Sequence, residues 1–339
     1  MGDAVIDFTE LVDLAQERLG GAVVAANDEF FAAKEAMLKP GAPEWREDAY
    51  TERGKWMDGW ETRRRRTPGH DWAVVRLGVP GHVHGVVVDT AFFRGNYPEH
   101  CSVDACELPG VPTAVELDAA PWAEILAKTP LQGNAVNRFA VDPARRWTHL
   151  RLNIYPDGGV ARLRVHGEAR PVFPRFVQRG GELDLASMEN GGWVMACSDM
   201  MYGDRQNLIL PGRSRFMGDG WETQRRRGPG NDWAIVRLAA PGVIHRVEID
   251  TDFFMGNAPD RCWIDGIFAP NATVEGLQDG GAAWRPVLPE AKLQPHARHR
   301  WESEGGAEAH PVTHVRLSTA PDGGVARLRL FGTLAEPQR

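Results

Sequence analysis

A long internal duplication constrains the fold of this chain more than any other feature of its sequence. Residues 58–78 (DGWETRRRRTPGHDWAVVRLG) and residues 219–239 (DGWETQRRRGPGNDWAIVRLA) are identical at 16 of 21 positions. Further segments match in the same order along the chain: 14–31 with 185–202, 86–101 with 247–262, and 157–164 with 322–329. The 339 residues therefore contain two copies of one folded unit, and each copy is far longer than a solenoid repeat.

The matched segments place one domain in residues 1–170 and a second domain in residues 180–339. Between them, EARPVFPRFVQRGGE (168–182) is rich in proline, glycine and charged residues, which indicates a linker. About ten residues near EWREDAYTER (44–53) are present in the first copy only. Because insertions between homologous domains fall in surface loops, we expect this segment to lie at the surface.

Short segments rich in β-branched residues predict an all-β fold. In the first copy they are WAVVRLG (72–78), HGVVVDTAFF (84–93), THLRLNIYP (148–156) and GVARLRVHG (159–167), with turn-forming residues between them. Residues 9–19 and 29–38 give only a weak helical signal. We expect two tandem homologous jelly-roll β-sandwich domains.

Two local patterns add detail to this expectation. DGGVAR (157–162) carries the Gly-Gly signal of a hairpin turn. In the strand that follows, alternation places Leu163 and Val165 on one face and three polar residues on the other, namely Arg162, Arg164 and His166.

Composition excludes several classes of function. With 46 acidic and 39 basic residues the net charge is −7, which disfavours binding to nucleic acid. No apolar stretch reaches the roughly 18 residues that span a membrane, and the first residues do not resemble a signal peptide. The four cysteines show no CxxC spacing, as is common in a reducing compartment. We therefore expect a soluble, cytoplasmic protein.

The arginine run admits two interpretations. Arginine clamps carboxylates with two parallel hydrogen bonds, so several arginines beside carboxylates could bind a small, anionic, urea-like molecule. Alternatively, the neighbouring acids pair internally with the arginines and hold the loop in shape. These acids are Asp58, Glu61 and Asp71 in the first copy and Asp219, Glu222 and Asp232 in the second.

The duplicated motifs resemble those of the allantoicase family. The resemblance rests on DGWETRRRRTPGHDWAVVRLGVPG, VDTAFFRGNYPEHCSVDA, DGGVARLRVHG and their second-copy counterparts, and it extends over nearly the whole chain. It implies hydrolysis of allantoate to ureidoglycolate and urea in purine catabolism, a duplicated jelly roll similar to galactose-binding and discoidin-type domains, and a homo-oligomer. The family often has His before the second aromatic of DT-x-HF-x-GN. Here Phe92 and Phe253 stand at that position, so an essential His would need a substitute.

The resemblance and the chemistry of allantoate suggest roles for residues in both copies. Breaking the C–N bond requires an acid to protonate the departing nitrogen and a base to activate water. Candidates for these roles are Glu61, His70, Asp71, Glu222 and Asp232. Candidates for binding the substrate carboxylate are Arg63, Arg64, Arg225 and Arg226, and candidates for binding ureido groups are Asn96 and Asn257.

The copies differ within the motif: Arg63 corresponds to Gln224, and His70 to Asn231. These differences favour an active site in the first copy, although a cleft between copies or subunits is equally allowed. No cofactor motif is evident. No HExxH, HxH or Cys/His ligand spacing occurs, which leaves a divalent metal bound by separated residues as an open alternative.

Structural roles account for several other recurring residues. His149, His314, His84 and His245 suit hydrogen bonding within or beside strands, and Cys101 and Cys262 suit packing. The motif tryptophans, Trp60, Trp72, Trp221 and Trp233, suit the core. The competing function is a non-catalytic, tandem jelly-roll protein that binds carbohydrate or another small ligand. An allantoicase-like chain that has lost activity is a third possibility.

Overall fold

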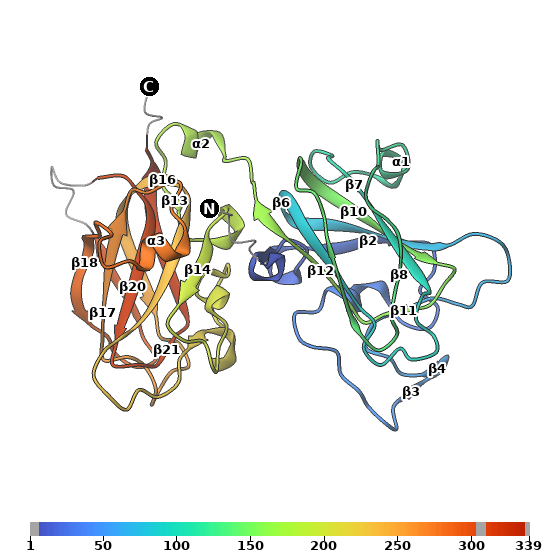
Figure 1. Cartoon of the computed structure of the whole chain (residues 1–339), viewed down its shortest axis with the longest axis horizontal. Helices are drawn as coiled ribbons and strands as arrows, with labels where there is room; N and C mark the ends of the chain where they lie inside the picture. The colour runs from blue at the N-terminus through green and yellow to red at the C-terminus, as the bar shows by residue number, and fades with distance from the viewer. Residues whose placement is uncertain (1–6, 303–309, 336–339) are drawn as a thin grey trace. The chain divides into compact units, whose positions relative to one another are not determined.

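The computed structural model describes residues 7–302 and 310–335 (Figure 1). The chain divides into two compact units, residues 1–170 and residues 171–339. Each unit consists mainly of antiparallel strands, and each contains one eight-stranded sheet that folds over on itself. The predicted fold class, two tandem jelly-roll β-sandwiches, is confirmed.

One long strand of the first unit, β6 (Asp71–Asp89), takes part in both layers of the sandwich. Its first half pairs with β2 (Ala22–Ala26) and β10 (Arg146–Tyr155), and its second half pairs with β9 (Val136–Ala140) and β12 (Arg162–Ala169). The main path of the sheet is β1-β12-β6-β10-β7-β8. The other strands described in this unit are β1 (Val12–Asp13), β3 (Tyr50–Thr51), β4 (Gly54–Lys55), β5 (Trp60–Glu61), β7 (His100–Cys106), β8 (Ala123–Pro130) and β11 (Gly159–Val160).

The second unit repeats this architecture around β16 (Asp232–Asp250). Its main path is β13-β22-β16-β20-β17-β18, with β14 and β19 also paired to β16. The strands described in this unit are β13 (Leu183–Asp184), β14 (Trp193–Cys197), β15 (Trp221–Glu222), β17 (Arg261–Ile267), β18 (Arg285–Lys292), β19 (Arg298–Glu302), β20 (Val312–Ala320), β21 (Gly324–Val325) and β22 (Arg327–Leu334).

Pro80 and Gly81 do not separate two strands, as the sequence suggested, but lie within β6. The register between β6 and β10 jumps from Arg76 to Gly81, so the residues between them bulge where the strand passes from one layer to the other. A proline is tolerated at a bulge because no ladder hydrogen bond is lost there. Two predicted strands are therefore one bent strand.

Two other local predictions are wrong. DGGVAR does not close a hairpin, because β10 and β12 do not pair with each other and both pair with β6, while β11 pairs with β5. The segments expected to be helical contain only short 3-10 turns, η1 (Phe8–Glu10), η2 (Glu17–Leu19) and η3 (Lys34–Leu38). Between η1 and η2 the chain pairs with β12 through β1, and this pairing competes with helix formation. The remaining helical segments are α1 (Ala114–Asp118), α2 (Arg175–Gln178), α3 (Val274–Gln278), η4 (Met188–Asn190), η5 (Arg205–Ile209) and η6 (Met217–Asp219).

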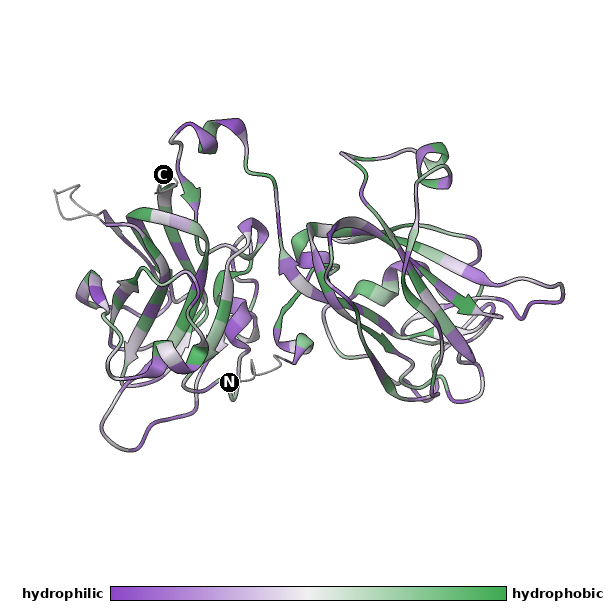
Figure 2. Cartoon of the chain, turned by 45° about the horizontal axis from the view of Figure 1, so that its top comes forward, coloured by the Kyte–Doolittle hydropathy of each residue, from purple (hydrophilic) through white to green (hydrophobic). Residues whose placement is uncertain are grey.

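Hydrophobic and hydrophilic residues alternate along many strands of both units (Figure 2). Trp60 and Trp221 lie at the centre of the two cores with no exposed surface, as predicted, whereas Trp72 and Trp233 are only half-buried. Replacing such a fully buried tryptophan by alanine typically costs about 3–5 kcal/mol. The polar face predicted for β12 is not solvated throughout, because Arg162 is 3% exposed.

The recurring histidines and cysteines have structural positions, as expected. His149 and His314 are buried, and the Nδ1 atom of each lies within 3.0 Å of the Oγ1 atom of the preceding threonine. Burial lowers the pKa of His314 to about 4, and Arg237 adds to this effect. Cys101 and Cys262 are fully buried. No helix among residues 7–302 and 310–335 is long and apolar enough to cross a membrane.

Candidate functional site

A short anchored strand fixes the start of the arginine run in each unit. In the first unit β5 pairs with β11, and in the second unit β15 pairs with β21. The indole Nε1–H of Trp60 donates to the carbonyl oxygen of Asp28 at 2.7 Å, and that of Trp221 donates to the carbonyl oxygen of Asp199 at 2.8 Å. Glu61 and Glu222, which follow these tryptophans, therefore each lie at the end of an anchored strand.

The arginines that follow point to different partners. In the first unit, Arg63 Nη2 lies 2.7 Å from Asp28 Oδ2, and Arg65 Nη1 lies 2.6 Å from Asp71 Oδ1. Arg64 is exposed and has no ion pair within the described part of the chain. In the second unit Arg226 pairs with Asp232. Arg63 and Arg226, two of the predicted substrate ligands, are thus bound to carboxylates of the chain itself.

A glutamate–asparagine pair recurs in both units. Asn96 Nδ2 donates to Glu61 Oε1 at 2.7 Å, and Asn257 Nδ2 donates to Glu222 Oε1 at 2.6 Å. Each pair joins the short strand before the arginine run, β5 or β15, to the GN turn after the long strand, β6 or β16. The fold thus brings together two residues that are 35 positions apart in the sequence. Burial raises the pKa of Glu61, and the hydrogen bond from Asn96 opposes this effect.

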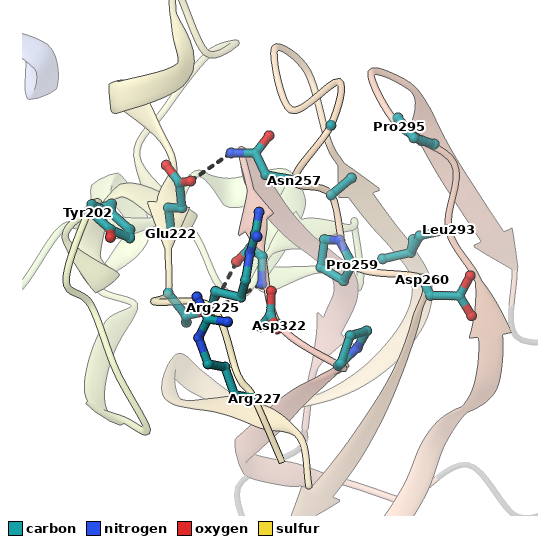
Figure 3. Close-up of a pocket in the computed structure, with 15 residues that line it drawn as sticks. Tyr202, Glu222, Arg225, Arg227, Asn257, Pro259, Asp260, Leu293, Pro295 and Asp322 are labelled. Atoms are coloured by element: carbon teal, nitrogen blue, oxygen red, sulfur yellow. Dashed lines mark hydrogen bonds between the residues drawn. The ribbon is translucent and has the colours of Figure 1, made fainter. Parts of the chain in front are cut away.

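In the second unit this pair lines a pocket of about 600 Å³ (Figure 3). Glu222 and Asn257 point toward each other and are joined by their hydrogen bond, and Arg225 and Arg227 lie on the side of Asp322. The backbone N–H of Arg226 donates to Asp322 at 2.8 Å, whereas neither lining arginine has an ion pair among the described residues. Three carboxylates also line the pocket, but Asp322 accepts this backbone N–H and Asp260 pairs with Lys292 at 2.8 Å. Arg225 and Arg227 are therefore available to an anionic ligand beside Glu222 and Asn257.

The first unit arranges the same pair differently. Its counterpart of Ala258 is Tyr97, whose ring packs so closely on Gly133 that a Cβ atom there would lie 2.4 Å from the ring. The Glu61–Asn96 pair instead lines a pocket of about 310 Å³. The other residues that line this pocket are Phe31, Trp45, Gly54, Lys55, Met57, Phe92, Arg94 and Gly95. Arg64 is not among its lining residues.

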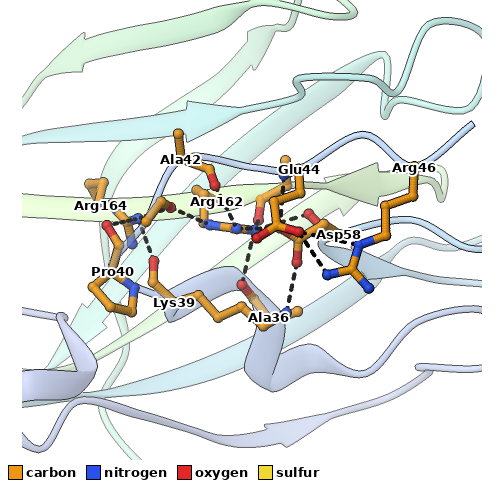
Figure 4. A network of polar contacts seen from close by, with 11 residues as sticks. Ala36, Lys39, Pro40, Ala42, Glu44, Arg46, Asp58, Arg162 and Arg164 are labelled. Atoms are coloured by element: carbon orange, nitrogen blue, oxygen red, sulfur yellow. Dashed lines mark hydrogen bonds and ion pairs between the residues drawn. The ribbon is translucent and has the colours of Figure 1, made fainter.

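The other motif acids form internal ion pairs, as the structural interpretation predicted. Asp58 is buried and accepts from Arg162 at 2.5 Å and from Lys39 at 2.7 Å (Figure 4). Asp219 accepts from Arg327 at 3.3 Å in the same way. Arg162 and Lys39 hold the pKa of Asp58 at about 2, against the opposing effect of burial.

The predicted acid–base candidates Asp71 and Asp232 belong to the same class of internal pairs. Asp71 is 1% exposed and also accepts from the side chain of Asn27 at 2.9 Å. Asp232 is 2% exposed and accepts from Ser198 Oγ at 3.0 Å. Neither lines the pockets around the glutamate–asparagine pairs. In the structure their contacts hold the arginine run against the start of the long strand.

His70, the remaining candidate, contacts an aromatic ring rather than the Glu61–Asn96 pair. Its ring centroid lies 4.7 Å from that of Tyr155, and its backbone carbonyl accepts a hydrogen bond from Arg65 at 3.3 Å. His70 does not line the first-unit pocket.

Phe92 and Phe253 have left-handed backbones, with φ of 69° and 71°. The backbone N–H of Phe92 donates to Asn134 Oδ1 at 2.8 Å, and that of Phe253 donates to His296 Nδ1 at 2.8 Å. A phenylalanine in this conformation costs about 1–3 kcal/mol, and such strain is concentrated at functional sites. The strained residue lies four positions before the asparagine of each pair and shapes the turn that presents it.

The structure adds residues that the sequence did not single out. Asp28 and Asp199 recur at matched positions of the two copies, and this recurrence of an acid was a signal for their contacts with the arginine segment. Tyr202 and Arg227 line the second-unit pocket, and Arg227 could have been found as the counterpart of Arg66. Among the described residues, no cluster of three His, Cys, Asp or Glu side chains could hold a metal ion.

Comparison with known proteins agrees with this architecture. A family model for the allantoicase repeat matches residues 12–170 and residues 183–335. The probable allantoicase 1 of Burkholderia mallei is 50% identical over 330 residues, which cover 97% of this chain and 96% of that protein. The probable allantoicase of Nocardia farcinica is 50% identical over 329 residues, which cover 96% of this chain and 95% of that protein.

A solved structure shares the fold of the whole chain. The crystal structure of allantoicase from Saccharomyces cerevisiae matches with a TM-score of 0.79 at 35% sequence identity, and the match covers 95% of this chain and 92% of that one. Matches to the family model, to relatives and to this structure all extend over nearly the full length. The chain therefore belongs to the allantoicase family.

Proposed function

We propose that this chain hydrolyses allantoate to ureidoglycolate and urea in purine catabolism, and that the reaction takes place in the second-unit pocket. Membership of the allantoicase family supports the reaction. One observation carries the location: Glu222 and Arg225 from the DGWETQRRR segment and Asn257 from the GN turn line one pocket of about 600 Å³. The differences between the copies favoured the first unit, but there Arg64 lies outside the pocket of the glutamate–asparagine pair.

The lining residues match the groups of allantoate, a carbon atom that bears one carboxylate and two ureido groups. Arg225 and Arg227 bind the carboxylate, because an unpaired guanidinium gains most from a bidentate anionic partner. Asn257 donates to Glu222, and its own carbonyl oxygen is left to accept from a ureido N–H. Binding at both ends of the substrate orients its central carbon toward Glu222.

Glu222 then acts as base and acid in turn. Its carboxylate takes a proton from a water molecule as the water oxygen bonds to the central carbon of allantoate. The C–N bond to one ureido group breaks, and the proton passes to the departing nitrogen, which leaves as urea. The products are ureidoglycolate and urea, and Glu222 returns to its starting state. Arg225 holds the substrate carboxylate throughout, so its contribution is to binding and orientation.

Release of urea from allantoate by the purified full-length chain tests this proposal. We expect Glu222→Gln to lower kcat by about 100-fold or more, because general acid–base catalysis contributes about 10²–10⁴-fold. Arg225→Ala should raise KM about 10- to 100-fold, as expected for loss of a charged hydrogen bond. Matched controls are Glu275→Gln and Arg285→Ala, since both residues are exposed, lie in the same unit and are remote in sequence from the motif.

The outcomes separate the alternatives. Full activity of Glu222→Gln would refute its acid–base role, and full activity of both variants would refute the second-unit location. No urea release by the unmodified chain, in the presence of chelator or of added divalent metal, would favour the competing function of a non-catalytic ligand-binding protein. Activity that a chelator abolishes and a divalent metal restores would contradict a mechanism in which Glu222 alone transfers the protons.

The proposal extends to assembly and location. A homo-oligomer is supported by large apolar side chains exposed on loops of the second unit, including Met200, Met201 and Phe216. A cytoplasmic location is supported by the four cysteines, all of which are free thiols. Light scattering of the purified chain tests the first point, and a monomer at micromolar concentration would contradict it. Fractionation of cells that express the chain tests the second.

A further inference from the structure

The first-unit pocket of about 310 Å³ has a wall that the second unit lacks. The inserted residues 44–53 include β3, which forms a hairpin with β4, and Trp45, Gly54 and Lys55 from this region line the pocket. The Trp45 ring centroid lies 5.6 Å from that of Phe92, which is in the turn that follows β6. The insertion thus encloses the Glu61–Asn96 pair with aromatic surface.

Charge in this pocket favours an anion. Arg94 lines it, is exposed, and has no ion pair or hydrogen bond within residues 7–302 and 310–335. Lys55 is held in the hairpin, where its Nζ atom donates to the carbonyl oxygen of Arg46 at 2.9 Å and lies 4.7 Å from the Trp45 ring centroid. Arg94 is therefore the cation available to a ligand, and Met255 takes its place in the second unit.

The uncharged groups define the rest of the ligand. Asn96 uses its amide nitrogen to donate to Glu61, so its carbonyl oxygen is left to accept an N–H. Trp45 and Phe92 offer flat surfaces on which a planar amide or ureido group can stack. Burial of Glu61 raises its pKa, which lowers the cost of protonating this carboxyl group when an anion enters.

We propose that the first-unit pocket is a second ligand site, selective for a small carboxylate that carries one amide or ureido group. Arg94 binds the carboxylate, and Asn96 and the aromatic wall bind the planar group. The pocket is about half the volume of the second-unit pocket, which limits the ligand to one such group. The ligand class follows from these lining residues alone, so the inference holds whether or not the second unit carries out the reaction.

Calorimetric titration with hydantoate, which has one carboxylate and one ureido group, tests the site. The full chain is used with Arg225→Ala, so that any binding in the second-unit pocket is weakened. We expect this variant to bind hydantoate saturably. Adding Arg94→Ala should weaken binding about tenfold or more, as expected for loss of a charge-assisted hydrogen bond. Adding Trp45→Ala should also weaken it, because the aromatic wall is lost.

The matched control is Met255→Ala in the same background, at the second-unit position that corresponds to Arg94. It should leave hydantoate affinity unchanged. Absence of binding by the Arg225→Ala chain would overturn the inference, as would equal affinities with and without Arg94. Thermal melting of each variant checks that it is folded, and both Arg94 and Trp45 are exposed enough for replacement to be tolerated. Urea release from allantoate is a separate readout, so this site and the proposed active site can fail independently.

Discussion

Replacing Arg162 by methionine is expected to destabilise the first unit strongly. Arg162 is 3% exposed and its Nη2 atom lies 2.5 Å from Asp58 Oδ2. Its guanidinium also donates to the carbonyl oxygens of Gly41 and Asp58, both at 3.0 Å (Figure 4). The side chain thus ties β12 to the loop before β3 and to the residue that begins the DGW motif. Methionine keeps much of the apolar stem but removes every one of these donors.

The magnitude follows from leaving a buried carboxylate without its main partner. Removing one member of a buried ion pair costs about 3–5 kcal/mol. For a unit of this size, 1 kcal/mol shifts the melting temperature by about 2–4 °C, so the transition should fall by roughly 6–20 °C. Lys39 still pairs with Asp58 at 2.7 Å, and this contact favours the lower part of the range.

Differential scanning calorimetry of the full chain measures the effect, with Arg46→Met as the control. Arg46 pairs with Glu44 at 2.8 Å, but their side chains are 60% and 62% exposed. An exposed pair contributes at most about 1 kcal/mol, so the control should shift the transition by no more than about 4 °C. Equal shifts for Arg162→Met and Arg46→Met would refute the reasoning, because they would show that burial adds nothing to the pair.

Two further predictions concern titration and reactivity. The pKa of Asp58 is about 2 in the folded chain against 3.8 for an unperturbed aspartate. Its stabilising contribution should therefore be complete above pH 4 and be lost as the pH falls toward 2. The Asp58→Asn variant should lack this loss of stability in acid, and identical acid unfolding profiles of the variant and the unmodified chain would contradict the prediction. Burial raises the pKa of Cys101 and Cys262 to about 12. Iodoacetamide at pH 8 should therefore alkylate these thiols only after denaturation, and mass spectrometry measures the alkylation. Rapid alkylation of the native chain would contradict their burial.

Sequence patterns were sufficient to predict the fold, because strands and turns follow local rules and the duplication shows each pattern twice. Period-two alternation and turn residues identified the strands, and the duplication identified the repeated unit. These patterns misplaced a strand end at Pro80, because a bulge in β6 accommodates a proline, which usually ends a strand. DGGVAR failed for a related reason, since which strands pair is decided by the whole sheet rather than by a turn signal.

The candidate site was only partly accessible from the sequence. Residue type and spacing pointed to Glu222, Arg225 and Asn257 as candidates, but could not predict which of the neighbouring arginines would pair with a carboxylate of the chain. Arg226 pairs with Asp232 and Arg225 lines the pocket, although the two are adjacent in the chain and identical in chemistry.

By itself, the sequence determined the duplicated jelly roll and the family, because both depend on patterns that are written along the chain. Only the tertiary structure decided which charges neutralise one another. Ion pairing depends on distances of a few ångströms between segments far apart in sequence, such as the 104 residues that separate Asp58 from Arg162. The same packing made the two units different. A hairpin and Arg94 line one pocket, whereas Ala258 and two arginines that have no ion pair among the described residues line the other.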